Sequence, residues 1–175
     1  DFCGAVDVII DQANRAPQEI QAVNDFMIQF KDSNIPLFLI YSAQIILLDD
    51  VTDNQANFGF ISIKSVLRQT RFYGIDFICQ VWNSIPEEQR MQLKQALIRG
   101  IMFERDDLRN TASSTLALVA QLEFPTQWPD FFDVLAALCQ EDSYGIFCIM
   151  GVLQTLADCF LSSTFIRPRY VKQKE

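Results

Sequence analysis

Apolar residues recur every three or four positions along most of this chain, which is the period of an α-helix with one buried side. The pattern is cleanest over residues 17–32, where an apolar and a polar stripe lie on opposite sides of one predicted helix. The apolar stripe consists of Ile20, Val23, Met27 and Phe30, and the polar stripe of Gln18, Gln21, Asp25, Gln29 and Asp32. We therefore expect one side of this helix to be buried and the other to face solvent or a partner.

The same period extends to the whole chain and predicts an all-α protein. The predicted helices cover residues 2–12, 17–32, 35–49, 58–73, 86–103, 108–122, 129–140 and 144–161. Residues 49–57 are polar and are expected to form a loop, whereas the apolar residues 75–82 fit a short helix, a continuation of the preceding helix, or a strand. In the last helix the residues expected to face the core are Ile146, Ile149, Met150, Leu153, Leu156 and Phe160.

Two aromatic corners divide the helices. In residues 122–132, LEFPTQWPDFF, Pro125 ends one helix and Pro129 suits the first turn of the next. A second corner, with the same order of an aromatic residue, a proline and acidic residues, runs from Trp82 to Glu88. We expect both tryptophans to be packing residues at helix–helix joints.

Successive predicted helices form pairs of about forty residues, which is the length of a HEAT repeat. Each pair has one apolar face that it cannot cover alone, so stacking of about four pairs into an α-α superhelix (a HEAT-repeat solenoid) would bury those faces. The alternative is a compact all-α bundle. The chain has 175 residues and begins with Asp1 instead of Met, so we expect residues 1–175 to be one HEAT-repeat domain cut from a longer solenoid.

Composition narrows the possible functions. There are 22 acidic and 14 basic residues, a net charge of −8, which argues against general binding of nucleic acid or anionic membranes. The chain has no histidine and its five cysteines form no CxxC motif, so neither a Cys/His zinc site nor a histidine-assisted nucleophile is expected. The longest apolar run, residues 35–48, is too short to span a bilayer. We expect no enzyme, no metal, no cofactor and no membrane segment.

Two charged patterns are candidate sites. Asp49, Asp50 and Asp53 form a DDxxD motif, which in all-α prenyl-diphosphate enzymes holds Mg²⁺. A solvated loop at a helix end is the favoured interpretation, because no second acidic motif is present. Lys64, Arg68 and Arg71 form a basic stripe at i, i+4 and i+7. Either these three cations cover a solvated face, or they bind carboxylates or phosphates of a partner.

The order of these features resembles the N-terminal region of the karyopherin-β (importin and exportin) family. The resemblance rests on four stretches: VNDFMIQFKDS at residues 23–33, the proline-started helix at residues 34–37, Trp82 through Arg90, and FPTQWPDF at residues 124–131. Residues 147–163 are similar to the fourth repeat of exportins, which favours the exportin branch. Residues 74–81 depart from the pattern because they are longer than the usual joint.

This resemblance implies that helices near residues 18–32, 58–73, 108–122 and 144–161 line a concave face that binds the small GTPase Ran in its GTP form. It also implies transport of a protein or RNA cargo, with export favoured over import, contacts of the full-length protein with nucleoporins, and shuttling between nucleus and cytoplasm. The candidate Ran-binding residues, chosen by helical facing, are Gln21, Asp25, Gln29, Lys64, Arg68, Arg71, Arg109 and Ser113. The alternative function is a HEAT-repeat interaction scaffold unrelated to Ran.

Overall fold

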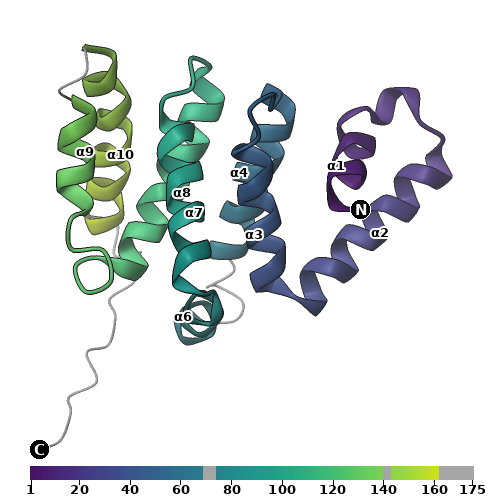
Figure 1. The fold of residues 1–175 in the computed structure, drawn as a ribbon, viewed down its shortest axis with the longest axis horizontal. Coiled ribbons are helices and arrows are strands. Elements are labelled where there is room, and N and C mark those ends of the chain that lie inside the picture. The colour runs from purple at the N-terminus through teal and green to yellow at the C-terminus, as the bar shows by residue number, and fades with distance from the viewer. Residues whose placement is uncertain (69–73, 140–142, 162–175) are drawn as a thin grey trace, which may run out of the picture.

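The computed structural model describes residues 1–68, 74–139 and 143–161 of the chain. Within these ranges the chain forms α-helices and one short 3₁₀ helix, η1, and no strand (Figure 1). The elements are α1 Phe2–Ile10, η1 Gln12–Asn14, α2 Pro17–Ser33, α3 Ile35–Ile46, α4 Asp53–Leu67, α6 Ile75–Ser84, α7 Glu87–Ile101, α8 Asp106–Glu123, α9 Phe131–Cys139 and α10 Ser143–Leu161. The prediction of an all-α protein is confirmed, and residues 75–82, which had been left open, lie in helix α6.

The helices stand in pairs, and the pairs lie side by side in a row (Figure 1). Helix α3 pairs with α4, α7 with α8, and α9 with α10. Between pairs, α3 packs on α7 in one layer, while α4 packs on α8 and α8 on α10 in the other. We call the layer of α4, α8 and α10 the second-helix layer. This arrangement is the α-α superhelix of HEAT type that the pairing of the sequence predicts.

The first pair joins the row differently from the prediction. Helix α2 packs on α3, and it is α1 that contacts α4. The ring of Phe2 explains this contact, because it lies 5.7 Å from Phe30 in α2, 5.8 Å from Phe38 in α3 and 6.4 Å from Phe58 in α4, measured between ring centroids. The expectation that residues 18–32 lie beside residues 58–73 in one layer therefore needs correction, since α1 occupies that position.

Helix α4 begins five residues earlier than predicted, at Asp53 instead of Phe58. The reason is a capping box: the Gln55 backbone N–H donates to Thr52 Oγ1 at 3.3 Å, and the Thr52 backbone N–H donates to Gln55 Oε1 at 3.0 Å. Two otherwise unpaired donors at the helix start are thus satisfied. The second half of the predicted loop 49–57 is therefore helical.

Helices α4, α7 and α8 meet at Gly100. A side-chain carbon added at this position would lie 2.3 Å from Cζ of Phe60 and 2.7 Å from Cβ of Ala112. Phe60 and Ala112 are both fully buried, so neither has solvent space to move into. The missing side chain of Gly100 therefore lets the Phe60 ring fill the centre of the core.

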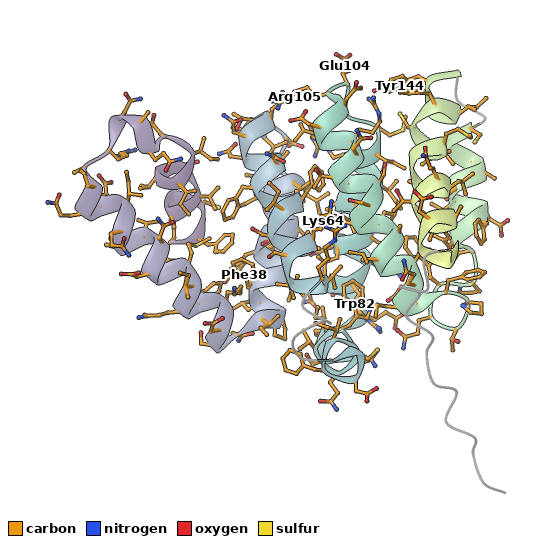
Figure 2. The ribbon with its side chains drawn as sticks, turned by 180° about the vertical axis from the view of Figure 1, so that it is seen from behind. Phe38, Lys64, Trp82, Glu104, Arg105 and Tyr144 are labelled. Atoms are coloured by element: carbon orange, nitrogen blue, oxygen red, sulfur yellow. The ribbon has the colours of Figure 1, made fainter. Side chains whose placement is uncertain are left out.

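A buried carboxylate at the end of α8 joins α6, α7 and α8. Glu123 accepts a hydrogen bond from Trp82 Nε1 at 3.0 Å and pairs with Lys94 Nζ at 2.8 Å and Arg90 at 3.5 Å. Lys94 also lies over the Trp128 ring, 4.7 Å from its centroid. Figure 2 shows Trp82 at the α6 end of the molecule. Both tryptophans are buried at helix joints, as predicted.

Helix α10 exposes residues that were predicted to face the core. Ile146, Met150 and Leu153 are exposed, whereas Cys148 and Val152 are buried. Within the described residues, α10 packs on α8 and α9. These two helices cover only part of the apolar side of α10, so the rest of that side is exposed. The predicted inward orientation is therefore wrong for Ile146, Met150 and Leu153 and confirmed for Ile149 and Leu156, and the side chain of Phe160 lies outside the described residues.

We expect Gly100→Ala to lower the free energy of unfolding by about 1–3 kcal/mol, because the added methyl group overlaps the Phe60 ring in a filled core. Gly151→Ala is the matched control: there the added carbon would meet only Ser113, at 3.4 Å, which is ordinary contact. We expect the control to be neutral or stabilising by about 0.5–1 kcal/mol. Urea unfolding followed by circular dichroism measures both, and equal effects would contradict the proposed close approach.

We expect Glu123→Ala to lower the free energy of unfolding by about 3–5 kcal/mol, since it leaves two partly buried cations and the Trp82 N–H without their acceptor. Asp53→Ala serves as the control, because it breaks an exposed ion pair with Arg105. An exposed pair is worth no more than about 1 kcal/mol. If both variants unfold at the same urea concentration, the buried carboxylate is not a principal source of stability.

Candidate functional site

The predicted site residues lie on three helices. Gln21, Asp25 and Gln29 are on α2, Lys64 is on α4 with Arg68 directly after its last residue, and Arg109 and Ser113 are on α8. Arg71 lies outside the described residues. The α4 and α8 positions belong to adjacent helices of the second-helix layer, whereas α2 lies against α1 and α3.

The polar stripe of α2 is exposed, as predicted. Gln21 Nε2 donates to Asp25 Oδ1 at 2.8 Å, which is an i, i+4 contact along the helix. Gln29 is exposed one turn further on. These side chains are therefore available to a partner, but on a helix separate from the α4–α8 surface.

Lys64 and Arg68 form a pair of cations that has no acidic neighbour in the part of the chain that the structure describes. Within residues 1–68, 74–139 and 143–161, no carboxylate lies within 4 Å of either side chain. Burial, together with the positive charge of Arg68, lowers the pKa of Lys64. The Lys64 side chain, labelled in Figure 2, is half-buried in the last turn of α4. The Arg68 side chain, directly after the helix, is exposed. This pair offers uncompensated positive charge on an otherwise acidic protein.

Arg109 is engaged within the chain. Its Nη1 donates to the carbonyl oxygens of Phe103 at 2.9 Å and Glu104 at 3.1 Å and to the Tyr144 hydroxyl at 3.1 Å, and its Nη2 pairs with Asp106. The Tyr144 hydroxyl in turn donates to the Phe103 carbonyl oxygen at 2.9 Å. Figure 2 shows Glu104 and Tyr144 at the same end of the molecule, opposite Trp82. Arg109 thus connects the α7–α8 joint to α10.

Ser113 is 2 % exposed and lies where α8 meets α10. Its hydroxyl has no hydrogen-bond partner among the described residues. Beside it is a groove of about 230 Å³ between the two helices. The groove is lined by Asp106, Arg109, Asn110, Ser113, Phe147, Cys148, Met150, Gly151 and Gln154.

The sequence analysis did not assign Phe147 and Met150 to a site, although they are 60 % and 58 % exposed beside this groove. The sequence did contain a sign of this exposure, because α10 carries more apolar residues than two neighbouring helices can cover. That excess was interpreted as a broad core face. Exposed aromatic and methionine side chains are typical of the centres of protein–protein interfaces.

The acidic DDxxD motif does not form a metal cluster. Asp49 and Asp50 are exposed in the turn before α4, while Asp53 pairs with Arg105 at 3.2 Å. No three Asp, Glu, Cys or His side chains in the described parts of the chain lie close enough together to hold a metal ion. The diphosphate alternative requires such a cluster, so this structure does not support it.

Among the described helices, none combines the length and the apolar composition that a membrane span requires.

The comparisons with known proteins concern the second half of the chain. The family model described as exportin 1-like protein matches residues 106–174, which begin with the first residue of α8 and include α9 and α10. No curated protein is significantly similar to the chain. The matched segment contains Arg109, Ser113 and the α8–α10 groove, whereas Lys64 and Arg68 precede it. The match shows that this segment, which is less than half of the chain, is similar to exportin 1-like proteins.

Proposed function

We propose that this chain is a module of a nuclear transport receptor that binds Ran in its GTP form on the second-helix layer. The observation that carries the proposal is the match of residues 106–174 to the exportin 1-like family on a HEAT-type helix array. The same family supports export over import, nucleoporin contacts of the full-length protein, and shuttling between nucleus and cytoplasm. The cargo is a protein or an RNA.

The unpaired cations on α4 support a protein partner at this layer. Lys64 and Arg68 have no acidic neighbour among the described residues, so a carboxylate or phosphate of a partner would gain an ion pair without breaking one. The charge of Arg68 also disfavours the protonated form of Lys64. An anionic group of a partner would offset the repulsion between these two cations, and this favours binding of the partner at this position.

In this proposal the chain contributes binding surface and no catalytic group. Nucleotide hydrolysis on the partner would change the shape of the bound surface and remove many contacts at once. Control of the complex would therefore come from the nucleotide state of Ran. A HEAT-repeat scaffold unrelated to Ran remains the second interpretation, and the experiment below separates the two.

We expect the chain to bind GTP-loaded Ran at least tenfold more tightly than GDP-loaded Ran, as measured by isothermal titration calorimetry. Reversal of either cation, Lys64→Glu or Arg68→Glu, should weaken binding of the GTP form by about tenfold or more, because attraction becomes like-charge repulsion. Arg15→Glu, between α1 and α2, changes the net charge by the same amount and should leave the affinity within about twofold.

Equal affinity for the two nucleotide forms would contradict the transport proposal and favour the scaffold. If Arg15→Glu weakened binding as much as Lys64→Glu did, the effect would come from net charge and not from a site on α4.

A further inference from the structure

The α8–α10 groove combines an apolar wall with polar edges. Phe147 and Met150 stand one turn apart on α10 and are the groove's most exposed apolar side chains. Asn110 of α8 and Gln154 of α10 are exposed at its edges and carry amide groups that can hydrogen-bond to a backbone. A volume of about 230 Å³ suits one large side chain and is too small for a whole helix.

The aromatic wall is held in place before any partner arrives. The guanidinium of Arg109 lies 4.8 Å from the centroid of the Phe147 ring, at the distance of a cation–π interaction. Arg109 is itself fixed by its bonds to the Phe103 and Glu104 carbonyl oxygens and to Tyr144. Because Phe147 rests on a fixed cation, a partner loses less side-chain entropy when it orders this ring.

The other exposed apolar residues of α10 do not share this setting. Ile146 precedes Phe147 directly and is similarly exposed, at 51 %, yet it does not line the groove. Exposure alone therefore does not distinguish the two neighbours. The groove and the Arg109 contact do.

The groove and the cation pair lie on the same layer with one helix between them. Helix α8 packs on both α4 and α10. Adjacent helix axes are about 8–10 Å apart, so the axes of α4 and α10 are separated by roughly 16–20 Å. The cations are also displaced along the helices from the groove, because Lys64 lies in the last turn of α4 and the groove lies at the start of α8. A single globular partner covers such a distance within an interface of ordinary size.

We propose that the partner held by Lys64 and Arg68 also inserts one large apolar side chain into the α8–α10 groove, between Phe147 and the edge of α8. This inference rests on the proposed function for the identity of the partner. It adds a specific chemistry: the partner presents an acidic group over α4 and, about two helix spacings away, an apolar side chain at the groove.

Three variants test the groove with GTP-loaded Ran as the probe. Phe147→Ala removes the aromatic wall and should weaken binding by about fivefold or more, as at the centre of an interface. Gly151→Leu fills the groove from within. A side-chain carbon at Gly151 meets only Ser113, at 3.4 Å, and leucine favours the helix over glycine, so this variant should unfold at no lower temperature than the native chain.

Ile146→Ala is the matched control, one residue from Phe147 and outside the groove, and it should change the affinity by less than about twofold. The double variant Lys64→Glu/Phe147→Ala should show additive losses, because the two positions are far enough apart to act independently. Thermal unfolding of each variant confirms that the fold is kept.

If Phe147→Ala behaves like Ile146→Ala, or if Gly151→Leu leaves the affinity unchanged, the groove is not occupied and this inference is overturned. A retained effect of Lys64→Glu would then show that the proposed function survives without the groove. If GTP-loaded Ran does not bind the native chain at all, both proposals fall together.

Discussion

The arrangement of the helix row depends on one buried negative charge. Glu123, with a side chain that is 1 % exposed, is the last residue of α8 and receives the Trp82 N–H and two cations from α7. A carboxylate in that position would be strongly unfavourable alone, and so would the cations around it. Since Glu123 at the end of α8 takes its partners from α6 and α7, the charge ties the orientation of α6 to the α7–α8 pair.

A second polar contact acts at the opposite end of the helices. There Arg109 and Tyr144 both bond to the Phe103 carbonyl oxygen, at 2.9 Å each, and so connect the α7–α8 joint to α10. Apolar packing alone would leave the angle between α8 and α10 weakly specified, because such contacts have little directionality. Hydrogen bonds at one end fix that angle and also position the surface that a partner would meet.

Most of the fold could be predicted from the sequence because helical periodicity and proline-marked joints are local signals. The positions of α2, α7 and α8 follow directly from them. Of the two features that were missed, one depends on a distant residue and the other on a local cap. The helical pattern did not reveal that Arg90 and Lys94 pair with Glu123, because Glu123 is about thirty residues away in the sequence. The early start of α4 depends on the Thr52–Gln55 capping box, which was overlooked.

The candidate site was less accessible to sequence reasoning than the fold. Helical facing placed Lys64 and Arg68 on one surface, but it could not distinguish an unpaired cation from one bonded internally, as Arg109 is. It also could not reveal that Phe147 stands over that guanidinium. Such distinctions depend on contacts between helices α7, α8 and α10, which are set by packing and not by the pattern within one helix.

The way the first pair joins the row has a mechanical consequence. Helices α1 and α2 meet the rest of the chain largely through a cluster of tilted and edge-to-face rings around Phe2, with one exposed hydrogen bond from Gln55 to Asp7. Ring contacts can slide and tilt at little cost compared with breaking hydrogen bonds. The remaining pairs are joined by charged and hydrogen-bonded contacts and are stiffer. The molecule is therefore compliant at one end and rigid at the other, so bending under load would concentrate at the aromatic joint.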